Sequence, residues 1–354
     1  VVDQLGVVAA GSSHQRAPID ILERLECGPQ RVCAGLGLFP VHGNRPGDLL
    51  RAAERALNEA HARGGDRLEI ASAELGRRVD SAFTLERSLL LAYRDELLEV
   101  AYQPIVDLKT GRAVAFACSI GWPGGGSGGI DFVPLAERLG LVGPLGRWLV
   151  DAACQGAAAW PMSGLDSPRL HLATSTSALL RRDFVAGLEA SLRRRDVRPS
   201  LIELELDTRT LGESERELLD ALRALRSLGI RIAFDHRGDA SGALRKLLEF
   251  PVDTLKLDPL LSAAALHPMP AVRRVIAGVV ALAHDLGAHV VADGVTSIEM
   301  LDALRACDVD AIQGSLVSPP VPFGRASNLL DRDLLGRLDA RRHFTTARPG
   351  SIQE

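Results

Sequence analysis

Polar side chains that could bind metal ions or take part in catalysis close a series of short apolar runs in this chain. They are Gln103, Glu205, Asp207, Asp235, His236, Lys256, Asp258, Asp293 and Gln313. Carboxylates supply the oxygen ligands that Mg²⁺ and Mn²⁺ prefer. His236 with Glu205 and Asp235 would also suit Zn²⁺ or Mn²⁺, although a solvent-facing or hydrogen-bonded histidine is the simpler interpretation.

The runs that carry these residues have the length of β-strands, and most are separated by enough chain of helical period for a crossover helix. They are Ala101–Val106, Val114–Ile120, Leu170–Ser175, Leu201–Asp207, Arg231–His236, Thr254–Asp258, His289–Gly294 and Ala311–Ser318. This alternation predicts an α/β fold, a TIM-like (β/α) barrel with parallel strands. In such a barrel the functional residues lie where the strands end, at the C-terminal face.

Length, composition and charge agree with a large globular core. The 354 residues suit a barrel of roughly 220–250 residues and an N-terminal module. The hydrophobic content of 46% supports a large core. The net charge of −4 and the low aromatic content give no electrostatic or stacking footprint for nucleic acid, so we expect none as a partner. The five cysteines are scattered and form no CxxC pair, which predicts reduced thiols in a cytoplasmic protein.

The longest apolar stretch, Val275–Ala283, is less than half of the roughly 20 residues that span a bilayer. It predicts a buried barrel helix, and we expect no membrane segment in this part of the protein. Because the chain begins with Val1 and has no basic leader, we expect it to be a fragment of a longer protein.

Four segments are predicted: a partial α/β module over 1–75, a helical connector over 76–99, the barrel over 100–335 and a disordered tail over 336–354. In the first, Leu5–Ala10 and Val32–Leu38 predict strands, and Pro18–Leu25 and Pro46–Ala62 predict helices that open on a proline. The connector is expected to hold an amphipathic helix over Thr84–Glu99, which leads into the first barrel strand.

The first segment carries Gly35–Pro40 (GLGLFP), Asp48–Leu57 (DLLRAAERAL) and Ala62–Arg67 (ARGGDR). On these motifs it resembles the second half of a GGDEF (diguanylate cyclase) domain. The family signature then falls on residues 1–5 (VVDQL), so valines replace two glycines and Gln4 replaces the catalytic acid. The resemblance therefore implies a degenerate, truncated domain without cyclase activity.

The barrel region carries ordered motifs over its whole length. They are Ala101–Asp107, Asp131–Glu137, Leu145–Trp148, Leu201–Glu205, Gly229–Asp235, Pro251–Asp258, Val290–Val295 and Gln313-Gly314. On these motifs the barrel resembles an EAL domain, the phosphodiesterase fold that linearises cyclic di-GMP with two divalent metal ions. The resemblance implies that a metal-activated water attacks a phosphodiester and that the metals are Mg²⁺ or Mn²⁺.

The resemblance also implies which site residues are lost. The signature glutamate falls on Ala117, the metal-binding asparagine of the third strand on Ala173, and a phosphate-contacting arginine on Gly121. Because a methyl group cannot coordinate a metal ion, we expect no catalysis and no bound metal. The remnant catalytic positions are Glu205, Asp235, Lys256 and Asp293, where Asp293 shortens the general-base glutamate, and the remnant metal positions are Glu205, Asp235 and His236.

Three functions remain open. The first is a catalytically inactive signalling protein whose folds serve as a protein-interaction or regulatory module, with an unidentified protein partner and a homodimer formed through the fifth and sixth barrel units. The second is a receptor that binds cyclic di-GMP without cutting it, through Gln103, Asp235, Asp258 and Gln313. Gly121 counts against the receptor, because an arginine–phosphate pair is a strong contact. The third is a weak, metal-dependent phosphodiesterase. Glu205, Asp235 and Lys256 could also persist as a structural ion cluster.

Overall fold

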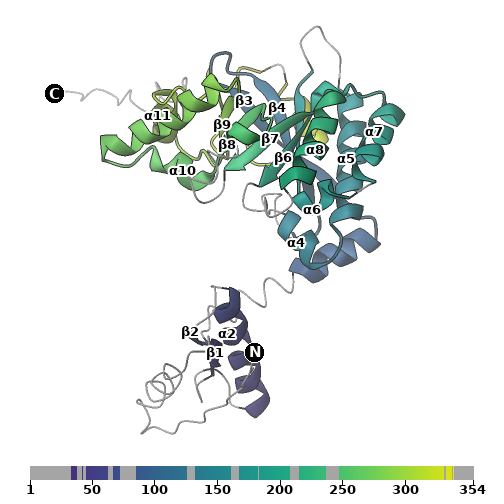
Figure 1. Cartoon of the computed structure of the whole chain (residues 1–354), viewed down its shortest axis with the longest axis vertical. Helices are drawn as coiled ribbons and strands as arrows, with labels where there is room; N and C mark the ends of the chain where they lie inside the picture. The colour runs from purple at the N-terminus through teal and green to yellow at the C-terminus, as the bar shows by residue number, and fades with distance from the viewer. Residues whose placement is uncertain are drawn as a thin grey trace, which may run out of the picture. The chain divides into compact units, whose positions relative to one another are not determined.

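The computed structural model describes residues 33–37, 42, 45–62, 67–71, 85–125, 132–160, 167–181, 183–207, 215–236, 247–330, 332–336 and 338. The chain divides into two compact units, Val1–Leu90 and Leu91–Glu354 (Figure 1).

In the first unit, two short parallel strands, β1 (Cys33–Leu36) and β2 (Arg67–Ile70), pair beside the helix α2 (Pro46–Ala62). The predicted helix Pro46–Ala62 is confirmed with its bounds. A side chain at Gly35 would collide with the α2 backbone, so a glycine is needed where strand and helix approach. The strand β2 was missed, although its sequence RLEI alternates in polarity. The elements predicted over 5–10 and 18–25 and the signature positions 1–5 lie outside the described residues.

The second unit is a closed eight-stranded barrel, which confirms the predicted fold class. Its strands are β3 (Glu99–Asp107), β4 (Ala113–Gly121), β5 (Arg169–Thr174), β6 (Ile202–Asp207), β7 (Arg231–His236), β8 (Thr254–Leu257), β9 (His289–Ala292) and β10 (Ala311–Gln313). They follow one another around the barrel in chain order, and β10 pairs with β3 to close it.

The expectation that all strands run parallel is wrong for β3. This strand pairs antiparallel with β4, with β10 and with the short β11 (Val321–Pro322). The link from β3 to β4, residues 108–112, is a tight turn that includes Gly111 at φ +70°, and it is too short for the crossover that parallel strands need. Glu99, at the start of β3, therefore lies toward the carboxyl ends of the parallel strands, Gln103 lies at the middle of the strand, and Asp107 lies toward their amino ends.

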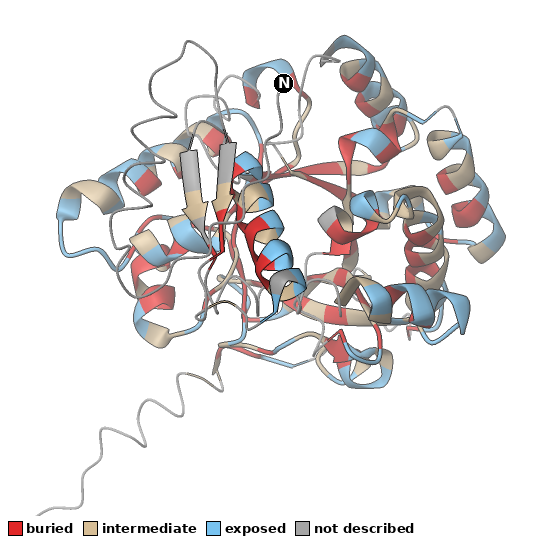
Figure 2. Ribbon diagram, turned by 90° about the horizontal axis from the view of Figure 1, so that it is seen from below, coloured by how far each residue is buried: buried red, intermediate tan, exposed pale blue. Residues whose placement is uncertain are grey.

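Helices surround the barrel on the outside. They are α4 (Phe132–Arg138), α5 (Val142–Ala158), α6 (Thr176–Leu179), α7 (Phe184–Arg195), η1 (Pro199–Leu201), α8 (Glu215–Ser227), α10 (Pro259–Ala264), α11 (Pro270–Asp285), α12 (Ile298–Arg305) and α13 (Phe323–Ser327). A further helix, residues 85–94, spans the boundary between the two units. Figure 2 shows buried positions along the strands and exposed positions on the outer faces of the helices. This distribution is the expected one for amphipathic helices packed on a sheet.

Two predicted elements end several residues earlier than expected, and a third differs in its burial. The connector helix stops at residue 94 because Asp95 and Glu96 turn the chain, with Glu96 at φ +56°, and Thr84 lies outside the described residues. The last barrel strand stops at Gln313, where Gly314 packs against the Val295 backbone so closely that a side chain would collide. The helix α11 is buried on one face only.

In α11, Ile276 and Val280 are fully buried, whereas Val275 is 64% exposed. The apolar run therefore belongs to an amphipathic helix, and the prediction of a helix buried throughout is wrong. Among the described residues, no helix combines the length and the apolar character needed to cross a membrane.

Candidate functional site

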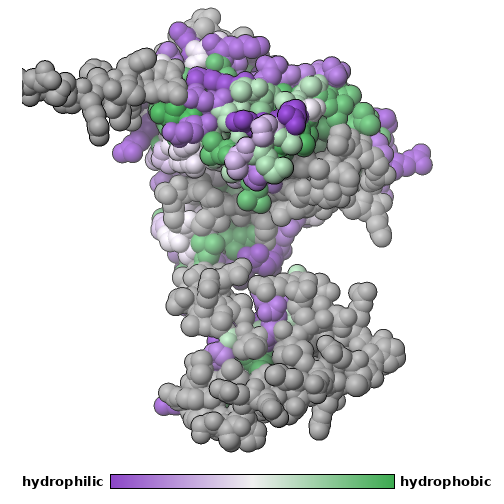
Figure 3. Space-filling model, turned by 90° about the vertical axis from the view of Figure 1, so that its left-hand side faces the viewer, coloured by the Kyte–Doolittle hydropathy of each residue, from purple (hydrophilic) through white to green (hydrophobic). Residues whose placement is uncertain are grey.

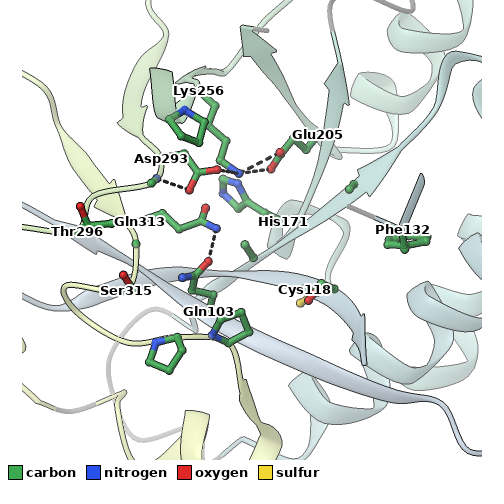
Figure 4. A pocket seen from close by; sticks show the side chains of 18 residues that line it. Gln103, Cys118, Phe132, His171, Glu205, Lys256, Asp293, Thr296, Gln313 and Ser315 are labelled. Carbon is green, nitrogen blue, oxygen red and sulfur yellow. Dashed lines mark hydrogen bonds and ion pairs between the residues drawn. The ribbon is translucent and has the colours of Figure 1, made fainter. Parts of the chain in front are cut away.

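A cavity of about 460 Å³ lies at the carboxyl ends of the parallel strands. It is lined by seven of the residues that the sequence singled out: Gln103, Ala117, Ala173, Glu205, Lys256, Asp293 and Gln313 (Figure 4). Its volume is in the range of small-molecule sites in proteins.

A buried ion cluster centred on Lys256 occupies one side of the cavity. The Nζ atom of Lys256 donates to both carboxylate oxygens of Glu205, at 3.0 and 2.9 Å, and lies 3.5 Å from Oδ2 of Asp293. Lys256 is 3% exposed and Glu205 is 9% exposed. Burial alone would lower the pKa of Lys256, but the charges of Asp293, Glu205 and Asp235 outweigh burial and raise it. Lys256 is therefore an ammonium ion between carboxylates.

The other predicted acidic and basic positions are placed differently. Asp235 is 3% exposed and faces Lys256 across the β7–β8 pairing, but it is not part of the cavity lining. Asp258 is the N-cap of α10, where its Oδ1 accepts a hydrogen bond of 2.6 Å from the Leu261 backbone N–H. The cap gives Asp258 a structural role. The side chain of His236 lies outside the described residues.

Two glutamines join across the seam where β3 meets β10. Gln313 Nε2 donates to Gln103 Oε1 at 2.7 Å, and Gln103 Nε2 donates to the Ser318 carbonyl at 3.1 Å (Figure 4). Gln313 Oε1 is buried and accepts no hydrogen bond within the described part of the chain. This oxygen is an acceptor that a bound ligand could use.

The floor of the cavity holds a pair that sequence reasoning missed, His171 and Glu203. His171 lines the cavity and is 2% exposed, and its Nε2 lies 3.2 Å from Oε2 of the fully buried Glu203. The same oxygen lies 3.3 Å from Nε of both Arg169 and Arg231. The signal was available, because His171 and Glu203 stand two residues before Ala173 and Glu205, and a strand places such residues on one face.

The electrostatics of Glu203 follow from these contacts. Complete burial would raise the pKa of this carboxyl, but the charge and hydrogen bond of His171, a hydrogen bond from Thr254 and the charge of Arg169 outweigh burial. They hold the pKa of Glu203 well below its usual range. Glu203 is therefore ionised inside the barrel and depends on its cationic neighbours.

A divalent metal ion does not fit the cavity residues as they are arranged. Ala117 and Ala173 present methyl groups to the cavity, and the carboxylates of Glu205 and Asp293 face Lys256. In the described ranges, no group of three or more histidines, cysteines, aspartates and glutamates is placed to hold a metal ion. Cys118, which also lines the cavity, is a buried free thiol whose pKa is raised by burial, so it is not a thiolate ligand.

Comparison with known proteins gives one family match and a set of relatives. Residues 86–320 match the model of the EAL domain. The cyclic di-GMP phosphodiesterase NbdA of Pseudomonas aeruginosa is 29% identical over 302 residues, 84% of this chain and 38% of that protein. The cyclic di-GMP phosphodiesterase PdeR of Escherichia coli is 27% identical over 81% of this chain and 44% of its own length. The chain thus spans less than half of the length of these relatives.

Among solved structures, a complex of the PaMucR phosphodiesterase with c-di-GMP superimposes with a TM-score of 0.60 at 27% identity, over 68% of this chain and 99% of that one. The EAL enzyme Bd1971, in its form bound to cAMP and cyclic-di-GMP, gives a TM-score of 0.64 at 24% identity, over 89% of this chain and 79% of that one. The second likeness supports the fold alone.

Proposed function

This chain belongs to the EAL-domain family, and from that premise we propose that its barrel is a non-hydrolysing module of cyclic di-GMP signalling that acts through binding interactions. On this proposal, the protein regulates or binds another protein of cyclic di-GMP signalling. Its partner protein would recognise the folded barrel and would not depend on turnover of a nucleotide.

One observation carries the proposal: the acidic groups of the cavity are held by Lys256, and the positions opposite them are alanines. Hydrolysis of a phosphodiester by this family's chemistry needs two divalent ions that activate water and neutralise charge at phosphorus. Here Lys256 supplies the positive charge beside Glu205 and Asp293. An ammonium ion can balance these charges, but it cannot generate a hydroxide nucleophile at neutral pH.

A second candidate is a receptor that binds cyclic di-GMP without cutting it. The cavity and the unused acceptor Oε1 of Gln313 favour this function, and a relative of 27% identity has been solved with that ligand. The absence of an arginine at Gly121 counts against it. The relatives named as phosphodiesterases make weak metal-dependent hydrolysis the third candidate.

Titration calorimetry with cyclic di-GMP, with and without Mn²⁺, separates the three. An interaction module gives no binding heat under either condition. A receptor binds without Mn²⁺ and binds more weakly when Gln313 is changed to alanine. A phosphodiesterase binds cyclic di-GMP in the presence of Mn²⁺ and converts it to the linear dinucleotide. Detection of this product in the calorimeter sample after the titration would overturn the proposal.

We further propose that the barrel forms a homodimer through the surface of α10 and α11. Large apolar side chains are exposed there, with Leu260 at 82%, Val275 at 64% and Met269 at 58%. Figure 3 faces this side of the unit and shows hydrophobic patches among hydrophilic ones. Exposed apolar groups in a cluster are typical of association surfaces. Sedimentation analysis of Leu260→Lys beside the unchanged protein tests this: a monomeric wild-type chain would refute it.

We also propose that the first unit derives from a GGDEF domain and has no cyclase activity. The order β1–α2–β2 and the motifs of residues 35–67 support this origin. Incubation of the chain with GTP and Mg²⁺ should give no cyclic di-GMP, and formation of this product would exclude the proposal.

A further inference from the structure

A second cavity, of about 430 Å³, lies at the amino ends of the barrel strands, away from the site described above. Arg169 and Arg231 are the first residues of β5 and β7, Arg198 precedes η1, and Arg226 lies in the last turn of α8. All four arginines line this cavity, together with Asp253, just before β8. Four separate segments of the chain thus bring arginines to the lining of one cavity.

Two of the arginines lie at the base of the cavity. Arg169 and Arg231 are half-buried, and the Nε atom of each lies 3.3 Å from Oε2 of Glu203. Burial lowers the pKa of Arg169, with the neighbouring charge of Arg231 acting in the same direction, yet an arginine stays protonated at every physiological pH. The base therefore holds two cations on one carboxylate.

The other two arginines lie at the rim. Arg226 Nη2 lies 3.3 Å from Oδ1 of Asp253, and Oδ2 of Asp253 accepts a hydrogen bond from the Ile232 backbone N–H. Arg198 is exposed and forms no ion pair with any residue that the structure describes. The rim therefore holds two cations and one carboxylate, and only Arg226 contacts that carboxylate.

The positive charges of the arginines at this cavity exceed the negative charges of the neighbouring carboxylates. The four arginines carry four positive charges, and the carboxylates of Glu203 and Asp253 carry two negative charges, which leaves a surplus of two at this place in a chain whose net charge is −4. Neutralising Glu203 would take one arginine, and Arg198 and Arg226 do not contact it. Residues at the amino-end face of a barrel usually stabilise the fold, but such a role accounts for only some of these four arginines.

We infer that this cavity binds a small molecule that carries a phosphate group. A phosphate monoester has a charge near −2 at neutral pH, which matches the surplus, and its oxygens suit the fork of guanidinium donors. A carboxylate would leave one positive charge unbalanced. The cavity is large enough for more than the phosphate, and its concave form fits a small molecule better than a nucleic-acid backbone.

Binding of inorganic phosphate, pyrophosphate and GMP to the full chain at pH 7.5 tests the inference, measured by calorimetry at constant ionic strength. At least one of these probes should bind with saturation, and Arg198→Ala should weaken that binding at least tenfold. Two controls should leave the binding unchanged: Arg223→Ala removes an exposed arginine of α8 that pairs with Asp220, and Gln313→Ala alters the other cavity. Arg198 is exposed and unpaired, so its loss should not impair folding.

The three probes also separate the possible sources of the phosphate group. Equal affinity for inorganic phosphate and GMP would show that the site recognises the phosphate group alone. Higher affinity for GMP would show that the rest of the cavity accommodates a nucleoside. Lack of binding of all three probes at millimolar concentration would overturn the inference. So would binding that Arg198→Ala leaves unchanged, or binding of a long polyanion such as heparin alone.

Discussion

Lys256 and Glu205 form an ion pair with two contacts, in which one ammonium nitrogen lies 3.0 Å from Oε1 and 2.9 Å from Oε2 of the carboxylate. Both residues point into the barrel from β8 and β6, and both are buried. Because both oxygens of Glu205 face Lys256, the carboxylate would have to leave this ammonium ion before it could serve as a metal ligand. The pair therefore favours binding functions over metal-dependent chemistry.

The first prediction is that the chain does not linearise cyclic di-GMP in the presence of Mg²⁺ or Mn²⁺. Ala117 and Ala173 stand where the resemblance to the family implies two metal ligands, and an alanine coordinates no metal ion. Stabilisation of charge by metal ions is the main catalytic contribution in this chemistry. Chromatography of the reaction mixture checks this against a sample without protein. Product that appears with the wild-type chain and disappears with Asp235→Ala would contradict the prediction.

The second prediction is that Ala117→Glu alone does not create activity. The substituted chain still has Ala173 opposite Glu205 and the shortened Asp293, and residues that act as a unit do not contribute additively. The same chromatographic assay measures the outcome, with the unchanged chain as the control. Turnover by the single substitution would mean that the remaining site is already organised for catalysis.

The third prediction concerns the stability of the Lys256 cluster. Lys256→Met leaves the buried Glu205 and the partly buried Asp293 without their cation, and the loss of one partner from a buried ion pair costs about 3–5 kcal/mol of unfolding free energy. Chemical denaturation of both chains measures this difference. Lys109→Met changes an exposed lysine in the β3–β4 turn and should cost well under 1 kcal/mol.

The melting temperature of Asp235→Asn tests the structural role of the same cluster independently. If Asp235 is a structural member, its neutralisation removes one of the charges that keep Lys256 protonated, and the melting temperature falls. A higher melting temperature for Asp235→Asn would show that the carboxylates repel one another in the free protein. That result would favour the receptor function, because sites kept for binding often cost stability.

Most of the barrel could be predicted from the sequence, because its apolar runs and their closing polar residues follow the strand period. The direction of β3 could have been predicted as well, because the link between the runs 101–106 and 114–120 is too short for the crossover that parallel strands need. Of the ligand-binding residues proposed, Gln103 and Gln313 do line the cavity, whereas Asp258 caps a helix. An aspartate before a proline-led helix signals a cap, so this role could have been inferred.

The pair of His171 and Glu203 shows why a family pattern leaves gaps. Resemblance directs attention to positions where the family has functional residues, and His171 and Glu203 stand one layer below them. Their partners, Arg169 and Arg231, come from different strands, and only the register of β5, β6 and β7 places them together. Spacing within one strand predicts a shared face, but it does not predict which charges meet across the barrel.

The last prediction is that Glu203 makes the stability of the chain depend on pH in the acid range. Its folded pKa is held well below the value of about 4.3 for an unfolded glutamate, so its contribution is fully present above pH 5. That contribution declines as the pH falls below about 4.3 toward the folded pKa. Glu203→Gln should therefore lower the unfolding free energy at pH 7, where Arg169 and Arg231 lose their shared carboxylate, and the deficit should shrink between pH 5 and pH 3. Urea titrations of both chains across this range measure the difference, and Glu99→Gln, at an exposed position, is the matched control. A deficit that stays constant from pH 7 to pH 3 would mean that Glu203 contributes through packing and not through its charge.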